Sequence, residues 1–316
     1  MPNYLHRHKD FPSLLRIVGA ELGIDPGLVE KDYWIMQSLY GLKKQGYQFE
    51  LKGGTSLSKG YNIIHRFSED IDIHITPPEA LGINPNPKNT NPKNIQAKAD
   101  FYDQLAKEIS IDGITEVKRD YAFDNPKTYN SGGIRLYYDT TTDTVEGIKE
   151  GILLEIGFDT VNPNNALNIS SWAYDKAVQQ GVPVINNIAI DIACYHPGYT
   201  FVEKLQTIAT KFRQEQESGE EKQNLMRQYY DVYSLLGHPL VQQFIGTEEY
   251  ESHKVARFPP KDYAISIAEN QAFQLEDQKL RSRFIERYKT TAALYYKNQP
   301  PFEDLLARIA TWLGKL

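Results

Sequence analysis

The sequence contains Leu51-Lys-Gly-Gly-Thr-Ser-Leu-Ser-Lys59 and, shortly after it, Phe67-Ser-Glu-Asp-Ile-Asp-Ile73. Side chains alternate along a strand, so Asp70 and Asp72 point to the same side of the second stretch. Two adjacent carboxylates repel each other unless a cation lies between them, and Mg²⁺ prefers oxygen ligands of this kind. The glycine turn in the first stretch can bring backbone N–H groups close to a phosphate. Together the two stretches predict a site for a metal ion and a triphosphate.

The composition is that of a globular protein. The 316 residues are 41% hydrophobic and 24% charged, enough for one large or two ordinary domains. The formal net charge of -6 argues against a nonspecific nucleic-acid coat protein, although it is compatible with a local basic surface. Cys194 is the only cysteine, which excludes an intrachain disulfide and a cysteine-based zinc site. Because the N-terminus lacks a signal-peptide core and no apolar run approaches the ~20 residues that span a bilayer, we expect a cytoplasmic protein with no membrane partner.

Helix and strand signals predict an α+β protein with a mixed α/β part over residues 1–196 and an all-helical part over residues 197–316. In the first part, Asp25 and Pro26 mark the start of a helix. The strands near 134–138 and 152–158 flank a polar connection and are expected to form an antiparallel hairpin. The expected helices are 11–22, 26–46, a turn at 55–61, 95–110, 201–215, 225–236, one or two within 264–297, and a final one with an apolar face from Phe302 to Leu313. The expected strands are 49–52, 70–75, 114–121, 133–138, 151–158 and 188–194.

Two connections are rich in residues that break regular structure. Pro and Asn dominate residues 77–94, which predicts an extended loop. Such a long loop beside a site is either a substrate lid or a disordered insertion. The charged stretch 214–224 is expected to be a solvated bend.

Glu155 is an acidic residue inside an apolar strand pattern, Leu153-Leu-Glu-Ile156. A buried carboxylate is costly unless it is paired or binds a metal, so Glu155 is a candidate third carboxylate of the site or a general base. The alternative is a strand edge, where Glu155 would reach solvent or Arg135. Asp159 is the second choice for the same role, and it could equally cap a turn.

Three further residues have more than one interpretation. Lys204 begins a helix and could reach a triphosphate, although a lysine in a first turn is usually solvated. Asp231 lies in an apolar helical pattern, and we expect it to pair with Lys204, Arg213 or Arg227 rather than to contact substrate. His74 continues the face of Asp70 and Asp72, which suggests either a mixed metal site or, as we prefer, a histidine at the rim of the cleft.

The motifs resemble those of the AbiEii/AbiGii-type nucleotidyltransferase toxins. The resemblance is carried, in the family's order, by Glu30-Lys-Asp-Tyr-Trp34, Gly53-Gly-Thr-Ser56, Arg66-Phe-Ser-Glu-Asp-Ile-Asp72, Glu203-Lys-Leu205, and Arg227 with Tyr230-Asp231. It covers residues 28–236, most of the chain. A glycine–serine turn before an Asp-x-Asp is shared by many nucleotidyltransferases, but five motifs in one order are specific to this family.

The resemblance implies a polymerase-β-like nucleotidyltransferase core with a mixed sheet over residues 1–196 and a helical domain over 197–316. It implies Mg²⁺ bound by Asp70 and Asp72. The nucleotide-binding residues that it implies are Gly53, Gly54, Thr55, Ser56 and Lys204, with Ser56 and Lys204 at the phosphates. The catalytic residues that it implies are Asp70, Asp72, Glu155 and Asp231.

The same resemblance implies the toxin half of a toxin–antitoxin pair linked to phage defence. Some of these toxins transfer a nucleoside monophosphate from an NTP to the 3′ end of tRNA and so block translation, and we expect this chain to act on an RNA acceptor, with the tRNA 3′ end as the first choice. The basic stretch Lys279-Leu-Arg-Ser-Arg-Phe-Ile-Glu-Arg-Tyr-Lys289 is a candidate RNA contact, although solvated surface is its more common explanation. Two alternatives stay open: nucleotidylation of a protein or small molecule, and an NTP-binding module without transfer. If the protein is a toxin of this kind, a cognate antitoxin is expected.

Overall fold

The computed structural model describes residues 2–145, 147–159 and 161–316. The chain divides into two compact units. The first comprises Met1–Asn62 and Phe67–Tyr195, and the second comprises Ile63–Arg66 and His196–Leu316. The short segment Ile63–Arg66, which precedes the strand of Asp70, therefore belongs to the second unit although the sequence around it belongs to the first.

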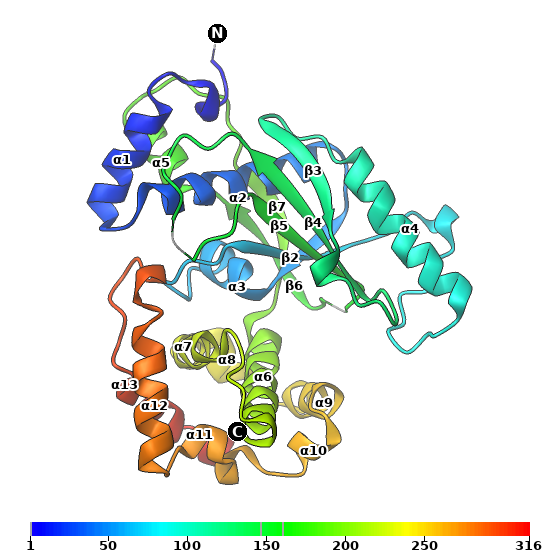
Figure 1. Ribbon diagram of the computed structural model, residues 1–316, viewed down its shortest axis with the longest axis vertical. Coiled ribbons are helices and arrows are strands. Elements are labelled where there is room, and N and C mark those ends of the chain that lie inside the picture. The colour runs from blue at the N-terminus through cyan, green and yellow to red at the C-terminus, as the bar shows by residue number, and fades with distance from the viewer. Residues whose placement is uncertain (1, 146, 160) are drawn as a thin grey trace. The chain divides into compact units, whose positions relative to one another are not determined.

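A mixed seven-stranded sheet forms the centre of the first unit, in the order β3-β4-β5-β2-β1-β7-β6 (Figure 1). Strand β2 pairs antiparallel with β1 and parallel with β5, and β1 pairs parallel with β7. Strands β4 and β5 form the predicted antiparallel pair. The strands are β1 (Phe49–Lys52), β2 (Asp70–Ile75), β3 (Ile114–Asp120), β4 (Ser131–Tyr138), β5 (Ile152–Gly157), β6 (Asn164–Ile169) and β7 (Ala189–Tyr195). This sheet, with the helices around it and the helical second unit, confirms the α+β class.

The helices of the first unit begin where the sequence places capping residues. The Asp25 side chain accepts a hydrogen bond from the Gly27 N–H at 2.7 Å, as the predicted N-cap of α2 requires. Asn91 does the same for Lys93 at 2.9 Å, so α4 begins at Pro92 and not at Ile95 as predicted. The helices are α1 (Phe11–Leu22), α2 (Pro26–Lys44), α3 (Gly53–Thr55), α4 (Pro92–Glu108) and α5 (Trp172–Gln179), with short turns η1 (Leu5–Arg7), η2 (Ser56–Gly60), η3 (Glu79–Leu81) and η4 (Tyr121–Phe123).

The two faces of the sheet differ in polarity. Alternate positions of β1, β2 and β5, such as Leu51, Ile71 and Leu154, are fully buried on the side that α2 covers. Because side chains alternate along a strand, the positions between them point to the opposite face. That second face carries the charged residues of β2 and β5. The candidate site therefore lies on the face opposite the apolar core.

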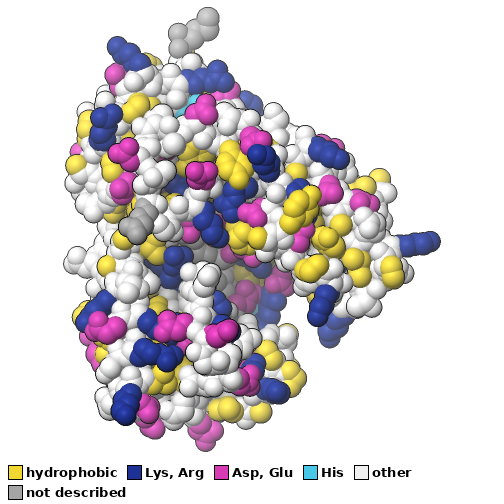
Figure 2. All heavy atoms as spheres, in the orientation of Figure 1, with side chains coloured by type: hydrophobic (Ala, Val, Ile, Leu, Met, Phe, Trp, Pro, Cys, Tyr) yellow, Lys and Arg dark blue, Asp and Glu magenta, His cyan; other side chains and the backbone are white. Residues whose placement is uncertain are grey.

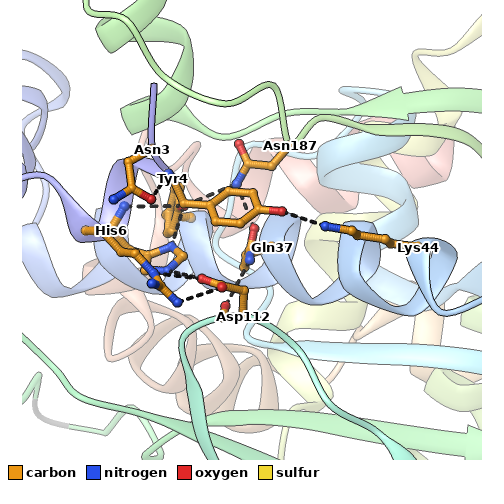
Figure 3. Close-up of polar contacts among 9 residues, drawn as sticks. Asn3, Tyr4, His6, Gln37, Lys44, Asp112 and Asn187 are labelled. Carbon is orange, nitrogen blue, oxygen red and sulfur yellow. Dashed lines mark hydrogen bonds and ion pairs between the residues drawn. The ribbon is translucent and has the colours of Figure 1, made fainter. Parts of the chain in front are cut away.

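Polar contacts attach the N-terminal segment to α2 (Figure 3). Nδ1 of His6 lies 2.8 Å from the Tyr33 hydroxyl, and its Nε2 lies 2.9 Å from Oδ1 of Asp112. Asn187 donates to the same Tyr33 hydroxyl at 3.2 Å, and Lys44 donates to the Tyr4 hydroxyl at 3.0 Å. These contacts connect four segments that are far apart in the sequence.

The second unit is helical. Its core includes α6, α7 and α13, and the predicted apolar face of the last helix is confirmed by the burial of Phe302, Leu305, Leu306 and Ile309. The helices are α6 (Pro197–Ser218), α7 (Leu225–Leu236), α8 (Pro239–Phe244), α9 (Glu248–Arg257), α10 (Pro260–Tyr263), α11 (Gln271–Gln274), α12 (Gln278–Lys289) and α13 (Phe302–Ala310), with turns η5 (Ile267–Glu269), η6 (Ala292–Leu294) and η7 (Leu313–Lys315). No helix in the described ranges is long and apolar enough to cross a bilayer.

Five of the described helices and strands were not predicted: β6, α5, α8, α9 and α10. Strand β6 has the sequence Asn-Asn-Ala-Leu-Asn-Ile, which is poor in β-branched residues, and it pairs only with β7 at the sheet edge. Helix α6 continues to Ser218, so the first half of the charged stretch 214–224 is helical and not a bend. The remaining half, up to Asn224, forms the connection to α7.

Candidate functional site

Three carboxylates lie together on the polar face of the sheet. The parallel register of β2 and β5 pairs Asp72 with Glu155 and Asp70 with Leu153. Alternation places Asp70, Asp72 and Glu155 on one side of these two adjacent strands. Both strands are interior to the sheet, so the backbone beneath the three residues is held on both sides.

Burial and mutual repulsion act on these carboxylates. Burial raises the pKa of Asp70 to about 6, and the neighbouring charges of Glu69 and Asp72 add to the rise. Burial also raises the pKa of Glu155 to about 7, with further repulsion from Asp72 and then Asp70. Within the described part of the chain, no side chain donates a hydrogen bond to any of the three carboxylates. A cluster of this kind has an unmet need for positive charge.

The alternative for Glu155, a strand edge with Arg135 as partner, is wrong. Strand β5 lies between β4 and β2. The Arg135 guanidinium donates to Oδ2 of Asp120 at 2.7 Å and to the Glu150 carbonyl at 2.9 Å. Asp159 pairs with Lys52 at 3.3 Å. Of the two candidates, Glu155 is the one beside Asp70 and Asp72.

The glycine turn is attached to the strand of the two aspartates. Gly53 has φ +69°, and a Cβ atom there would lie 2.1 Å from Oδ2 of Asp72, so only glycine fits. The Thr55 hydroxyl donates to the Asp70 carbonyl at 2.5 Å. Thr55 and Ser56 are both 0% exposed, and the Ser56 hydroxyl lies beside the thiol of Cys194. The part of the turn that reaches the carboxylates is therefore the Gly53 backbone and not a hydroxyl group.

The donor set fits Mg²⁺. Carboxylate oxygens are the ligands that this ion prefers, and it usually takes the rest from water and substrate phosphates. Asp70 and Asp72 would hold the ion, with Glu155 adjacent. Among the described residues, no group of three or more His, Cys, Asp or Glu side chains forms a ready metal site. The protein would thus supply part of the coordination only.

His74 has a partner of its own. Its Nδ1 lies 3.1 Å from the Gly157 carbonyl oxygen. The ring lines a pocket of about 370 Å³ together with Asp159 and residues 84–87 of the Pro/Asn-rich loop. This loop contains η3 and is otherwise irregular up to α4, as predicted.

Three consecutive charged residues on α2 hold the segments around the site, a role that the helical pattern did not predict. Glu30 accepts hydrogen bonds from residues 140–142, including the Thr141 N–H at 2.9 Å. Lys31 pairs with Glu69 at 3.4 Å. Asp32 pairs with Lys59 of η2 at 2.6 Å and accepts from the Trp172 N–H at 2.8 Å. All three α2 residues are buried, and each fixes a different segment.

Lys204 and Asp231 lie together in the second unit. Asp231 is 0% exposed and pairs with Lys204 at 3.0 Å, which confirms the predicted ion pair. Its second partner, Arg66, donates through Nε at 2.7 Å and through Nη2 at 2.6 Å. Burial favours the neutral form of Asp231, but these two cations hold its pKa below the usual value. Arg213, one of the expected alternatives, binds Asp262 instead.

The basic helix α12 uses its charges within the second unit. Arg287 pairs with Glu215 at 2.9 Å, Lys289 pairs with Glu286 at 2.7 Å, and Arg281 pairs with Glu303. Figure 2 shows Lys and Arg side chains interleaved with Asp and Glu side chains over this unit. Much of the charge of this helix is therefore used in ion pairs, where we expected a solvated surface, and the RNA contact stays a prediction.

Enzymes that transfer phosphoryl groups commonly hold the metal ion with carboxylates, next to a backbone that can approach a phosphate. The first unit brings these together on one mixed sheet, and on that ground we place the chain among the nucleotidyltransferases. A family model described as "Nucleotidyl transferase AbiEii toxin, Type IV TA system" matches residues 34–308. The chain belongs to this family, and is accordingly a toxin-type nucleotidyltransferase with an NTP substrate and an antitoxin partner.

The structure is similar to the crystal structure of an antigenic nucleotidyltransferase-like protein from Paracoccidioides brasiliensis, with a TM-score of 0.32 and 12% sequence identity, over 74% of this chain and 95% of that chain. No curated protein sequence matches the chain.

Proposed function

We propose that this protein transfers a nucleoside monophosphate from an NTP to the 3′ end of tRNA in a Mg²⁺-dependent reaction, and thereby blocks translation. The observation that supports the proposal is the group Asp70, Asp72 and Glu155, which lies without hydrogen-bond donors from the described residues beside the Gly53 turn. Family membership supplies the toxin context.

In the proposed reaction the acceptor hydroxyl attacks the α-phosphate of the NTP, and pyrophosphate leaves. When bound, Mg²⁺ would neutralise the developing negative charge. Glu155 is the carboxylate of this group that is not assigned to the ion, and it would accept the proton of the acceptor hydroxyl. The rigid pairing of β2 and β5 keeps its carboxylate next to Asp72, which contributes through positioning. The role of Lys204 in phosphate binding and the role of Asp231 in catalysis stay predictions.

The proposed setting is the bacterial cytoplasm, as one half of a toxin–antitoxin pair that limits phage infection. The antitoxin would be either a binding partner or an inhibitor that acts without stable binding.

Label transfer tests the proposal. The protein is incubated with Mg²⁺, total tRNA and each α-labelled NTP in turn. We expect label on tRNA with the wild type and none with Asp72→Asn. The matched control is Asp100→Asn, which removes an exposed carboxylate of α4 and should leave transfer unchanged.

The other outcomes separate the alternatives. Label on a protein or a small molecule, sensitive to Asp72→Asn, would replace tRNA as the acceptor. Nucleotide binding without any transfer would favour an NTP-binding module and contradict the proposal.

A further inference from the structure

We propose that Lys149 forms a phosphate-binding site next to the carboxylates of β2 and β5. The inference rests on the proposed nucleotidyl transfer for its context, since it adds a residue to the same site. The bound phosphate belongs either to the NTP or to the backbone of the RNA acceptor.

The backbone of Lys149 is held by a buried ion pair. Its N–H donates to Oε2 of Glu69 at 3.2 Å, and its carbonyl accepts from Nζ of Lys31 at 2.5 Å. Lys31 and Glu69 are only 2% and 9% exposed. Breaking a buried pair is costly because it leaves an uncompensated charge. The pair therefore fixes the position of Lys149 in the segment that leads into β5.

The side chain of Lys149, in contrast, is exposed and has little to hold it. Its Nζ lies 4.7 Å from the centre of the Phe123 ring. Across the ranges that the structure describes, no carboxylate lies within ion-pair distance of this nitrogen. A cation–π contact at an exposed position is weak, and an ammonium group has three donors to offer. A phosphate oxygen can therefore replace the ring contact at low cost.

Lys149 lies near the N-terminal ends of β2 and β5, the two strands that carry the three carboxylates. Glu69, which accepts from the Lys149 N–H, directly precedes Asp70 of β2. Lys149 itself leads into β5, the strand that carries Glu155. Phe123, whose ring the Lys149 Nζ contacts, packs against Gly133, and Gly133 pairs with Glu155 across β4 and β5. A lysine fixed in this place can contact a phosphate that is shared with a cation on those carboxylates.

A second position for the phosphate is disfavoured. Lys149 also lines a pocket of about 400 Å³ together with Lys31, but four carboxylates line the same pocket: Glu30, Asp139, Asp143 and Glu150. These four carboxylates, which have no ion pair with the described residues, outnumber the two lysines and disfavour an anion there. On the side of β2 and β5, a divalent cation would reverse the sign of the local charge.

Equilibrium binding to the full-length protein tests the site, with inorganic tripolyphosphate as the probe for the NTP and total tRNA as the probe for the acceptor, both in the presence of Mg²⁺. We expect Lys149→Met to weaken binding of at least one probe by about tenfold or more, the loss of one charge-assisted hydrogen bond. Lys149→Arg should stay within about threefold of the wild type, since it keeps the charge. The matched control is Lys107→Met on α4, an exposed lysine whose loss should change neither affinity.

The pattern of losses identifies the phosphate. Weaker tripolyphosphate binding places Lys149 at the NTP, and weaker tRNA binding places it at the acceptor backbone. Unchanged affinity for both probes, no binding by the wild type, or equal losses with Lys107→Met would overturn the inference. The binding measurements do not depend on transfer. If the label-transfer experiment gave no labelled product, this would contradict the proposed function and leave the phosphate site of Lys149 to be decided by the binding measurements.

Discussion

Asp72 of β2 and Glu155 of β5 are direct neighbours across a parallel strand pair. Neither carboxylate receives a hydrogen bond from a side chain in the described ranges, and the charge of Asp72 contributes to the raised pKa of Glu155. Folding thus brings together two groups that repel each other. A protein retains such an arrangement where a cation or a reaction uses it.

The first prediction concerns this repulsion. Asp72→Asn removes one charge of the cluster, so at pH 8 without divalent ions we expect the variant to be at least as stable as the wild type. Added Mg²⁺ should raise the melting temperature of the wild type and not that of the variant. At a concentration 100 times the dissociation constant, the expected stabilisation is about 2.7 kcal/mol. Calorimetry with and without Mg²⁺ measures it, and an equal response of both proteins would contradict Mg²⁺ binding by Asp72.

The second prediction concerns the approach of the glycine turn to Asp72. Gly53→Ala should abolish transfer, because the new Cβ would lie 2.1 Å from Oδ2 of Asp72. Gly46→Ala is the matched control: Gly46 also has a positive φ of +88°, but nothing lies within 4 Å of its added Cβ. Both variants should lose about 1 kcal/mol to backbone strain. Transfer assays should therefore show activity in Gly46→Ala and none in Gly53→Ala, although the backbone strain of the two variants is similar. Retained activity in Gly53→Ala would contradict the idea that the close approach of Gly53 to Asp72 is needed for transfer.

The third prediction concerns Asp231. Its replacement by Asn leaves Arg66 and Lys204 without their shared anion, and Arg66 is only 4% exposed. We expect a loss of about 3–5 kcal/mol in the free energy of unfolding. Asp262→Asn is the control and should cost less, because its partner Arg213 is more exposed and also pairs with Glu217. Urea denaturation measures both, and a stable but inactive Asp231→Asn would show that the carboxylate acts in the reaction beyond holding the two cations.

The fourth prediction concerns the N-terminal contacts of His6. Burial lowers the pKa of His6 below its usual value, so the folded protein binds fewer protons there than the unfolded chain. Its contribution to stability is thus complete above the unfolded pKa of about 6.5 and is lost as the pH falls below it. His6→Gln should remove this part of the pH dependence, which melting temperatures between pH 5 and 8 would measure. His8→Gln, at a more exposed position, is the control, and parallel curves for wild type and His6→Gln would contradict the prediction.

Local patterns were sufficient for most of the elements. The ranges of α1, α7, β1 and β2 match the predictions, because hydrophobic periodicity and capping residues act over a few neighbours. The same locality explains the errors at α5, α8, α9 and α10, which are short helices whose apolar positions are few. The carboxylate group was predictable in part, since alternation alone places Asp70 and Asp72 together.

Except for the pair of Lys204 with Asp231, the partners of the buried charges were not predictable from the sequence. Arg66 and Asp231 are 165 residues apart in the sequence and bind each other with two hydrogen bonds. Lys149, in a polar connection, carries no motif that marks it. Three consecutive charged residues on a helix predict an exposed turn. Each of Glu30, Lys31 and Asp32 is instead buried against a different segment.

The sequence by itself determined the α+β class, the glycine turn, the Asp70/Asp72 pair and the family, because these depend on neighbouring residues and on motif order. Only the tertiary structure decided that Glu155 joins the aspartates, that Arg66 shares Asp231 with Lys204, and that Lys149 stands beside the site with no carboxylate partner among the described residues. The physical reason is that strand pairing and burial of charge are set by contacts between distant segments, and a linear pattern contains no record of which segments meet.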